Sequence, residues 1–347
     1  HSLSPETGPR RAITLVALIA AGETVFFLPF LLARVFRPTV LDVFGLSNFE
    51  LGTAYGVYGL VAMFAYLMGG PLADRFNPRT MLVIALAGTA LGGLWLLSIP
   101  SLETLILLYA FWGVTTIALF WAPLIRATRE WGGELSQGKA FGLLDGGRGL
   151  LAAATASVMV LMFAALLPTE PALANLEQRS AALRQIILLL MLIVGSTAVL
   201  LWFALPAQAH TTTAAQQATP RLELRAIIRA LALPTIWLQA VIILCAYVGF
   251  RAIDDFSLYA NQVLGSDEVE AAGLSTMALW VRPFAAVSAG FMADRFGANK
   301  LTAISFVLLA IGATPEQLRN EPLVWAKIAP LGPVLILPGL WAAIFSS

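Results

Sequence analysis

Residues 70–79 read Gly70-Pro71-Leu72-Ala73-Asp74-Arg75-Phe76-Asn77-Pro78-Arg79 and lie between two long apolar runs. A second copy, in the later half of the chain, reads Gly290-Phe291-Met292-Ala293-Asp294-Arg295-Phe296-Gly297-Ala298-Asn299-Lys300 and also separates apolar runs. A short connection between membrane helices needs close helix approach, a polar group at a helix end and basic residues that keep it cytoplasmic. Glycine, aspartate and arginine or lysine meet these needs. Two copies in corresponding places predict a duplicated bundle of membrane helices.

The composition independently indicates a membrane protein. Hydrophobic residues make up 59% of the chain and charged residues 12%, whereas an ordinary globular protein is about 25% charged. This composition excludes a soluble enzyme, and the net charge of +1 argues against a nucleic-acid partner. The single cysteine, Cys245, lies in an apolar run, so we expect neither a disulfide framework nor a thiolate metal site. Because no nucleophile–base pair or metal-ligand cluster has usable spacing, we expect no enzymatic activity, no metal and no cofactor.

The repeated pattern resembles the signature loop of the major facilitator superfamily, G-x-L-A-D-R-x-G-x-R/K, found between helices 2 and 3 and again between helices 8 and 9. The first copy has Asn77 where the family prefers glycine, and asparagine also accepts left-handed backbone. The second copy has Met292 for leucine and one extra residue before Lys300. The resemblance covers roughly residues 12–312. It implies an all-α polytopic membrane protein with two pseudo-symmetric six-helix bundles, and it says almost nothing about the substrate.

Apolar runs long enough to cross a bilayer, about 20 residues each, place the helices. Six precede residue 206, and the low-complexity stretch 206–220 then reads as the linker between halves. We therefore expect an N-terminal six-helix bundle at 12–206, a cytoplasmic linker with a basic amphipathic segment at 207–231, and a C-terminal bundle at 232–347. The expected helices of the first half are 12–35, one ending at 69, 80–98, one ending at 125, one starting at 140 and one ending at 205, with a polar loop at 126–139.

The second half does not have room for six helices. Helices 7 and 8 are expected at 236–263 and 269–292, and helix 9 begins at 301, so little chain is left after it. We expect that the sequence joins or truncates segments and that helices 10–12 are largely missing. Because His1 stands where a starting methionine belongs, residues 1–9 are left out of the fold prediction.

The distribution of basic residues predicts the orientation. If the amino terminus is cytoplasmic, twelve lysines and arginines fall on inner segments and four on outer ones. This bias places both signature loops and the linker in the cytoplasm, in a multi-pass protein of the plasma or inner membrane. The inner residues are Arg10, Arg11, Arg75, Arg79, Arg126, Arg129, Lys139, Arg221, Arg225, Arg229, Arg295 and Lys300, and the outer ones are Arg34, Arg37, Arg179 and Arg184.

Ionisable residues within the predicted helices are the candidates for substrate binding, because charge in a bilayer is costly. Arg282 has no acid within four residues on its own helix, so it must find a partner on another helix, snorkel, or face a cavity. Tryptophans at this depth could stack on a ligand or simply pack. Cationic side chains in a cavity favour an anion, so we expect a small organic anion: a sugar acid, sugar phosphate or sulfonate. The substrate-binding candidates are Glu23, Trp121, Arg148, Arg251, Trp280 and Arg282.

Proton coupling would have to use carboxylates, because neither histidine lies in a predicted helix. The candidates are Glu23, Asp145, Asp254 and Asp255. Two alternatives stay open: Arg251, Asp254 and Asp255 stand at i, i+3 and i+4 and could form a self-satisfied salt-bridge cluster. Asp145 and Arg148 could form an inner gate or pair with the preceding loop.

The resemblance also implies a cytoplasmic gate, braced by the two signature aspartates rather than by contact with substrate. Its expected members are Gly70, Asp74, Arg75, Arg79, Arg126, Arg129, Gly290, Asp294, Arg295 and Lys300.

We therefore expect a monomeric secondary active transporter that moves a small solute by alternating access. One rival is a proton-coupled exporter of lipophilic or cationic compounds that uses Glu23. The other is a non-transporting membrane receptor with the same fold, since a fold does not fix function.

Overall fold

The computed structural model describes residues 8–133, 137–168, 171–206 and 232–312. Every regular element in these ranges is a helix, as the all-α prediction requires. They fall into two compact units, one formed by residues up to 207 together with 254–284, the other by 208–253 and 285–347. The expected linker at 207–231 and the proline-containing end at 313–347 lie outside the described residues. The predicted domain boundaries at 206 and 232 remain predictions.

Among the described residues of the first unit, six helices are long and apolar enough to cross a membrane. These spans are Arg10–Val35, Asn48–Arg75, Pro78–Leu97, Leu102–Gly132, Ala140–Leu166 and Leu176–Ala204. The elements that build them are α1 (Gly8–Thr24), η1 (Phe27–Leu31), α2 (Leu32–Val35), α4 (Asn48–Arg75), α5 (Pro78–Leu97), α6 (Leu102–Gly113), η2 (Val114–Ala118), α7 (Trp121–Gly132), α8 (Gln137–Leu166) and α9 (Leu176–Ala204). Two short helices, α3 (Arg37–Phe44) and η3 (Pro171–Leu173), lie in the connections.

The remaining helices come from the second half of the chain. They are α11 (Pro234–Arg251), η5 (Ala252–Asp255), α12 (Phe256–Gln262), α13 (Glu268–Phe296) and α14 (Ala298–Gly312). The expected helix 7 is therefore interrupted by a 3-10 turn, η5, at its two aspartates. This turn places Asp254 and Asp255 outside the regular i, i+3, i+4 face assumed from the sequence.

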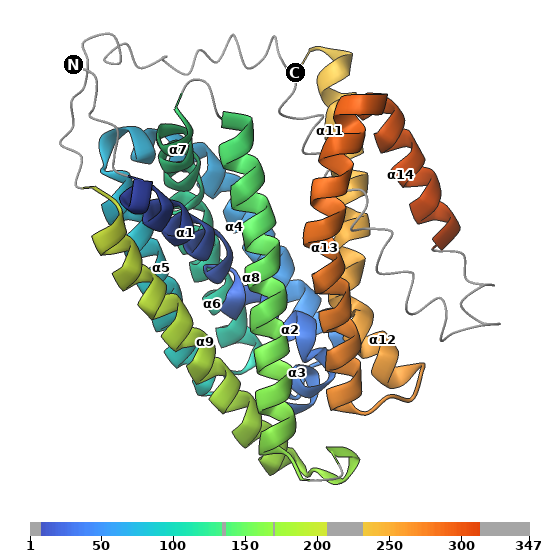
Figure 1. The fold of residues 1–347 in the computed structure, drawn as a ribbon. Helices are drawn as coiled ribbons and strands as arrows, with labels where there is room; N and C mark the ends of the chain where they lie inside the picture. The colour runs from blue at the N-terminus through green and yellow to red at the C-terminus, as the bar shows by residue number, and fades with distance from the viewer. Residues whose placement is uncertain (1–7, 134–136, 169–170, 207–231, 313–347) are drawn as a thin grey trace. The chain divides into compact units, whose positions relative to one another are not determined.

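Within the first unit, α5 packs along α9, α4 along α6, and α1 against both α8 and α9 (Figure 1). Large, fully buried side chains, including Phe27, Trp112, Phe120 and Phe163, fill the core. The opposite face of α4 exposes large apolar side chains such as Phe64 and Leu67. Such a face suits lipid rather than water, which agrees with a membrane-spanning helix.

The first signature stretch is mostly helical rather than a loop. Helix α4 continues through Arg75, and α5 starts at Pro78, so only Phe76 and Asn77 form the turn. Asn77 has φ −67° and ψ 127°, and its side chain accepts a hydrogen bond from the Arg79 backbone N–H. The left-handed backbone expected at Asn77 is thus wrong: asparagine serves there as the N-cap of α5. In the second copy Gly297 has φ +88°, and there glycine meets a conformational need.

Among the glycines of α4, the one that packs closely against a neighbouring helix is Gly69, one residue before the signature stretch. A Cβ built on Gly69 would lie 3.3 Å from the Ala118 carbonyl oxygen, whereas one on Gly70 would meet nothing within 4 Å. Gly69, rather than Gly70, therefore lets α4 pack against the backbone of the fourth span.

The fourth span extends beyond the predicted end at residue 125. Helix α7 continues to Gly132, so the loop expected from residue 126 is wrong as far as that residue. An ion pair of 3.0 Å between Arg126 and Glu130, at i and i+4, supports the extra turns. Leu124, Ala127 and Thr128 are buried at helical spacing. The polar composition of residues 126–132 had not indicated that the helix continues there with one buried face.

Two spans contain a π-helical turn, a feature that often marks functional positions. In the first span it covers Phe27–Leu31 and includes Pro29, whose carbonyl accepts a 2.7 Å hydrogen bond from the buried Tyr109 hydroxyl. In the fourth span it covers Val114–Ala118 and includes Thr116, whose hydroxyl donates to the Trp112 carbonyl at 2.7 Å. Side chains therefore satisfy backbone groups where the regular α-helical bonding changes.

Candidate functional site

The site centres on Glu23, which lies near the middle of the first span, Arg10–Val35. Its Oε2 accepts a hydrogen bond of 3.1 Å from Nε of Arg148 on α8. The Arg148 and Glu23 side chains are only 9% and 8% exposed. A buried charged pair of this kind needs good geometry and further partners to compensate for desolvation.

Arg148 finds such partners on its own helix and on α7. Its Nη1 lies 3.1 Å from Oδ1 of Asp145, one turn earlier on α8. Its guanidinium lies 5.6 Å from the centroid of the Trp121 ring, within cation–π range. A Cβ built on Gly22 would lie 3.1 Å from Cδ of Arg148, so the small residue beside Glu23 leaves room for the arginine stem. Three helices thus hold one guanidinium in place.

Arg282 brings a second guanidinium to the same group. It lies at the midpoint of α13, and its side chain is partly buried. It is attracted electrostatically by Glu23 and Asp145 and repelled by Arg148. We call Glu23, Trp121, Asp145, Arg148 and Arg282 the central cluster; all five belong to the first compact unit.

Aromatic side chains continue from the central cluster along the first span. Phe26 contacts Trp121 with ring centroids 6.3 Å apart. Phe30 contacts Tyr55 and Tyr58, with centroids 5.5 and 4.8 Å away. These five rings are only partly buried, in contrast to the fully buried Trp112, which packs in the core and donates to the Thr89 carbonyl. The sequence had singled out Trp121 but not the phenylalanines and tyrosines, because periodicity does not show which aromatic residues contact one another beside a charged group.

The other predicted substrate and proton residues lie elsewhere. Asp254 pairs with Arg34 and Asp255 with Arg37, at the ends of η5, α2 and α3. Arg251 ends α11 in the second compact unit. From the sequence, Arg34 and Arg37 had been considered only as basic residues of the outer segments. Their position at the end of an apolar span was the feature that could have identified them as partners of buried carboxylates.

Trp280, on α13, donates a 2.9 Å hydrogen bond from its indole N–H to the hydroxyl of Ser157 on α8, and it is 40% exposed. The contact joins α13 to α8 without a link to the charged groups of the central cluster.

Several predicted gate residues contact backbone near the first signature turn. Arg126 donates to the Ala73 carbonyl at 2.7 Å, and Arg79 donates to the Leu205 carbonyl at 3.4 Å. The Arg79 guanidinium also lies 4.0 Å from the ring centroid of Trp202. These contacts tie the ends of α4, α5, α7 and α9 together. Of the remaining predicted gate residues, Gly70, Asp74, Arg75, Arg129, Arg295 and Lys300 are exposed, and the side-chain surroundings of Gly290 and Asp294 lie outside the description.

Within the described ranges, no group of three or more histidine, cysteine, aspartate or glutamate residues is arranged to hold a metal ion. Cys245 is exposed on α11. The polar chemistry of the described site therefore consists of arginines, carboxylates and aromatic rings.

Comparison with known sequences gives a family and distant relatives. The family profile of the Major Facilitator Superfamily matches residues 12–315. Inner membrane protein YqcE of Escherichia coli is 24% identical over 262 residues, which is 76% of this chain and 59% of the relative. Inner membrane protein YihN of the same organism is 28% identical over 134 residues, 39% of this chain and 32% of the relative. The chain thus spans about three fifths of YqcE and a third of YihN.

Solved structures show the same fold. A bacterial homolog to the human lysosomal transporter Spinster, in an inward-facing and occupied conformation, superposes with a TM-score of 0.64 at 18% identity, covering 96% of this chain and 74% of that one. A D-xylose–proton symporter superposes with a TM-score of 0.63 at 14% identity, covering 96% and 80%. At such low identities the likeness concerns the fold alone.

Proposed function

Because the chain belongs to the Major Facilitator Superfamily, we propose that it is a secondary active transporter that carries a small organic anion across the inner membrane by alternating access, together with a proton. Membership of this superfamily makes it a transporter rather than an enzyme. The inner membrane is suggested by the two Escherichia coli relatives, both of which are named inner membrane proteins.

The observation that carries the proposal is that Arg148 and Arg282, both in the interior of their helices, interact electrostatically with the same two carboxylates, Glu23 and Asp145. They come from α8 and α13, and Glu23 of α1 interacts with both. Transporters built from repeats bind substrate near the bilayer midplane between their halves. An arginine presents a planar set of donors that matches carboxylate, phosphate or sulfonate oxygens. An anion entering this site would replace a carboxylate as the partner of one guanidinium.

Charge balance supports a coupled proton. The ionised forms of Glu23 and Asp145 offset the charges of Arg148 and Arg282, so the four groups sum to zero. Adding a monovalent anion leaves an uncompensated negative charge in a poorly solvated place, which is costly. Uptake of one proton by Glu23 or Asp145 would restore neutrality of the group.

A ligand panel tests the anion assignment. Thermal unfolding of the detergent-purified protein would be followed with D-glucuronate, D-glucose 6-phosphate, methanesulfonate, neutral D-glucose and tetraphenylphosphonium. A ligand that binds only the folded state at one hundred times its dissociation constant adds about 2.7 kcal/mol of stability. We expect stabilisation by at least one anion, lost in Arg148→Gln and in Arg282→Gln. Arg184→Gln, at an exposed position on α9, is the matched control and should keep the response.

Flux then separates transport from binding. Proteoliposomes given the stabilising anion should accumulate it when a proton gradient is imposed, and anion entry should acidify an unbuffered lumen. Glu23→Gln should uncouple the two. Specific binding with no flux in either direction would favour a receptor that kept the fold, and an absence of binding by every anion would refute the assignment.

The aromatic group beside Glu23 favours a second candidate, a proton-coupled exporter of lipophilic cations. Phe26, Phe30 and Trp121 offer ring faces that can stabilise an organic cation. In that case tetraphenylphosphonium, rather than the anions, would stabilise the protein. Glu23→Gln would weaken that effect, and Arg184→Gln would not.

A further inference from the structure

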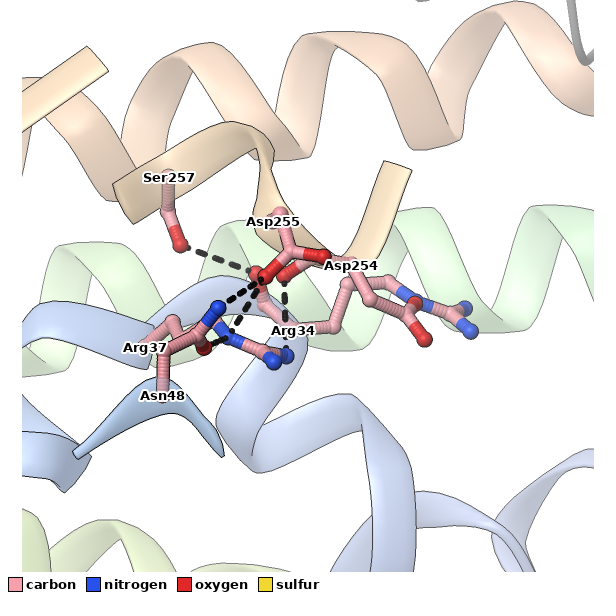
Figure 2. A network of polar contacts seen from close by, with 6 residues as sticks. All are labelled: Arg34, Arg37, Asn48, Asp254, Asp255 and Ser257. Atoms are coloured by element: carbon pink, nitrogen blue, oxygen red, sulfur yellow. Dashed lines mark hydrogen bonds and ion pairs between the residues drawn. The ribbon is translucent and has the colours of Figure 1, made fainter. Parts of the chain in front are cut away.

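A network of ion pairs joins the end of the first span to the turn η5. Nε of Arg34 lies 2.5 Å from Oδ1 of Asp254, and the two side chains are only 9% and 6% exposed. Nε of Arg37 lies 3.0 Å from Oδ1 of Asp255, and its Nη1 donates to the Asp254 backbone carbonyl. Asn48 accepts from Arg37 at 2.7 Å and donates to Asp255 at 3.2 Å (Figure 2). We call these five residues the distal cluster.

A second set of contacts joins the same two parts of the chain. Arg179, on α9, lies 2.7 Å from Glu268 at the start of α13 and 3.2 Å from Asp42 on α3. The Thr39 hydroxyl donates to Glu268 at 2.9 Å. The fully buried Ser257 donates to the Arg34 carbonyl (Figure 2). Residues 254–268 are thus held to the first six helices by side chains from α2, α3, α4 and α9.

The distal cluster and the first signature turn lie at opposite ends of the bundle. Asn48 begins α4 and Arg75 ends it, and 28 residues of helix extend about 42 Å. That length matches a bilayer with its headgroup regions. The distal cluster therefore lies at the membrane face opposite the signature turn, which the basic-residue bias predicts to be the outer face.

Charges of the central cluster also attract the segment 254–284 to the first six helices. Glu23 and Asp145 belong to the first six helices, Arg282 belongs to the segment 254–284, and both carboxylates attract it. Arg34 is also attracted by Glu23, and it is repelled by Arg282. Separating the segment 254–284 from the first six helices would break the Arg34–Asp254 pair and the attraction between Glu23 and Arg282 together.

We propose that the distal cluster is a latch that holds this face of the transporter closed, and that neutralising Glu23 loosens it. The inference rests on the proposed function, because a latch has a role only where access alternates. The buried Arg34–Asp254 pair is the main contact, since its charges gain water only when the face opens. The Arg37–Asp255 pair contributes less, because Asp255 is already 51% exposed. Loss of the Glu23 charge removes its attraction for Arg282 and favours opening. Binding of a proton or an anion in the central cluster is thereby coupled to the latch. The charged groups that interact with Glu23 are Arg34, Asp145, Arg148 and Arg282.

A buried cysteine reports opening of the latch. Ser257→Cys would be introduced into a Cys245→Ala background, and the full chain in lipid nanodiscs would be labelled with a polar maleimide. Both faces are accessible in a nanodisc, so the result does not depend on orientation. We expect Asp254→Asn to raise the labelling rate of the reporter at least tenfold, and Glu23→Gln to raise it several-fold. Glu270→Gln, at an exposed position of the same segment and outside the distal cluster, is the control and should change the rate less than threefold.

Two further variants separate opening from misfolding. The double variant Arg34→Gln/Asp254→Asn leaves no unpaired charge in that pair and should show the same fast labelling. A second reporter, Ala198→Cys, is placed at a buried position of α9 and should stay slow in every variant that folds. Equal labelling rates in Asp254→Asn, in the double variant and in the parent would refute the latch. An unchanged rate in Glu23→Gln alone would refute its link to the central cluster. Anion stabilisation measured on the same samples separates these failures from a failure of the proposed function.

Discussion

Arg148 is the residue on which the central cluster depends, because it contacts Glu23, Asp145 and Trp121 at once. Removing one partner from a buried ion pair leaves the other charge uncompensated and typically costs about 3–5 kcal/mol. We expect Arg148→Gln to destabilise the protein by an amount of that order. Glu23→Gln should cost less, because Arg148 keeps its contact with Asp145.

A double-mutant cycle measures the coupling of this pair. The double variant Glu23→Gln/Arg148→Gln should be more stable than the sum of the single effects predicts, by about 1–3 kcal/mol. Reversible denaturation in detergent, or the shift in midpoint temperature, supplies the values. Strict additivity would mean that the 3.1 Å contact contributes nothing to the folded state.

Glu268 gives a pH dependence of stability. It lies just before the expected helix 8, where burial raises the pKa of its carboxyl above the ordinary 4.5, although the Thr39 hydrogen bond and Arg179 oppose this shift. Asp42 and Asp267 also raise the pKa. The folded state then binds the proton more tightly than the unfolded chain. The contribution of Glu268 to stability is therefore greatest below pH 4.5 and decreases as the pH rises through the raised pKa.

Replacing this carboxyl group tests the sign. Relative to Glu268→Gln, the wild type should lose stability as the pH increases from about 4.5, and each unit by which the pKa is raised is worth about 1.4 kcal/mol. The stability of Glu270→Gln, a variant at an exposed position in the same turn of α13, should depend on pH in the same way as that of the wild type. A wild type that gains stability relative to Glu268→Gln over this range would show that Arg179 outweighs burial.

At the level of elements, small residues set how closely α1 and α8 pack. A Cβ built on Gly147 would lie 2.7 Å from Cδ1 and 2.8 Å from Cγ2 of Ile19, both below normal contact distance. The neighbouring Gly146 has nothing within 4 Å of such a Cβ. The two adjacent glycines of α8 therefore allow a matched comparison.

Gly147→Ala should lower stability by about 1–3 kcal/mol, because the added methyl group overpacks the interface. It should also weaken anion binding, since Arg148 is the next residue. Gly146→Ala should be neutral or stabilising by up to about 1 kcal/mol, because alanine favours a helix. Midpoint temperatures of the two variants provide the check; similar losses in both would point to backbone effects rather than contact with Ile19.

Element positions were predictable from apolar length, and their interruptions were not. The first six helices lie close to their expected places because a bilayer demands about 20 apolar residues from each. The π-helical turns at Phe27–Leu31 and Val114–Ala118 change hydrogen bonding without changing composition. The extension of α7 to Gly132 is accompanied by an ion pair and by buried small residues, neither of which the polar composition of the segment indicates.

At the scale of the whole molecule, the charged residues of the central cluster could be predicted singly but not as a group. Glu23, Arg148 and Arg282 stood out because an ionisable group in an apolar helix is expensive. Their convergence from three helices is a tertiary fact that spacing along one helix cannot give. The same limit applies to Asp254, whose contact with Arg34 joins residues far apart in the sequence.

Orientation in the membrane is the remaining property of the whole molecule, and the basic-residue bias predicts it. Single cysteines in a Cys245→Ala background can report it: Ser98→Cys after α5, and Phe76→Cys in the turn between α4 and α5, both at exposed positions. The two reporters lie at opposite ends of α5. In intact cells an impermeant maleimide should label Ser98→Cys, and Phe76→Cys should react only after permeabilisation, because the basic residues Arg75 and Arg79 keep that turn in the cytoplasm. The reverse pattern would place the distal cluster at the cytoplasmic face. The proposed latch would then control release to the cytoplasm rather than entry from outside.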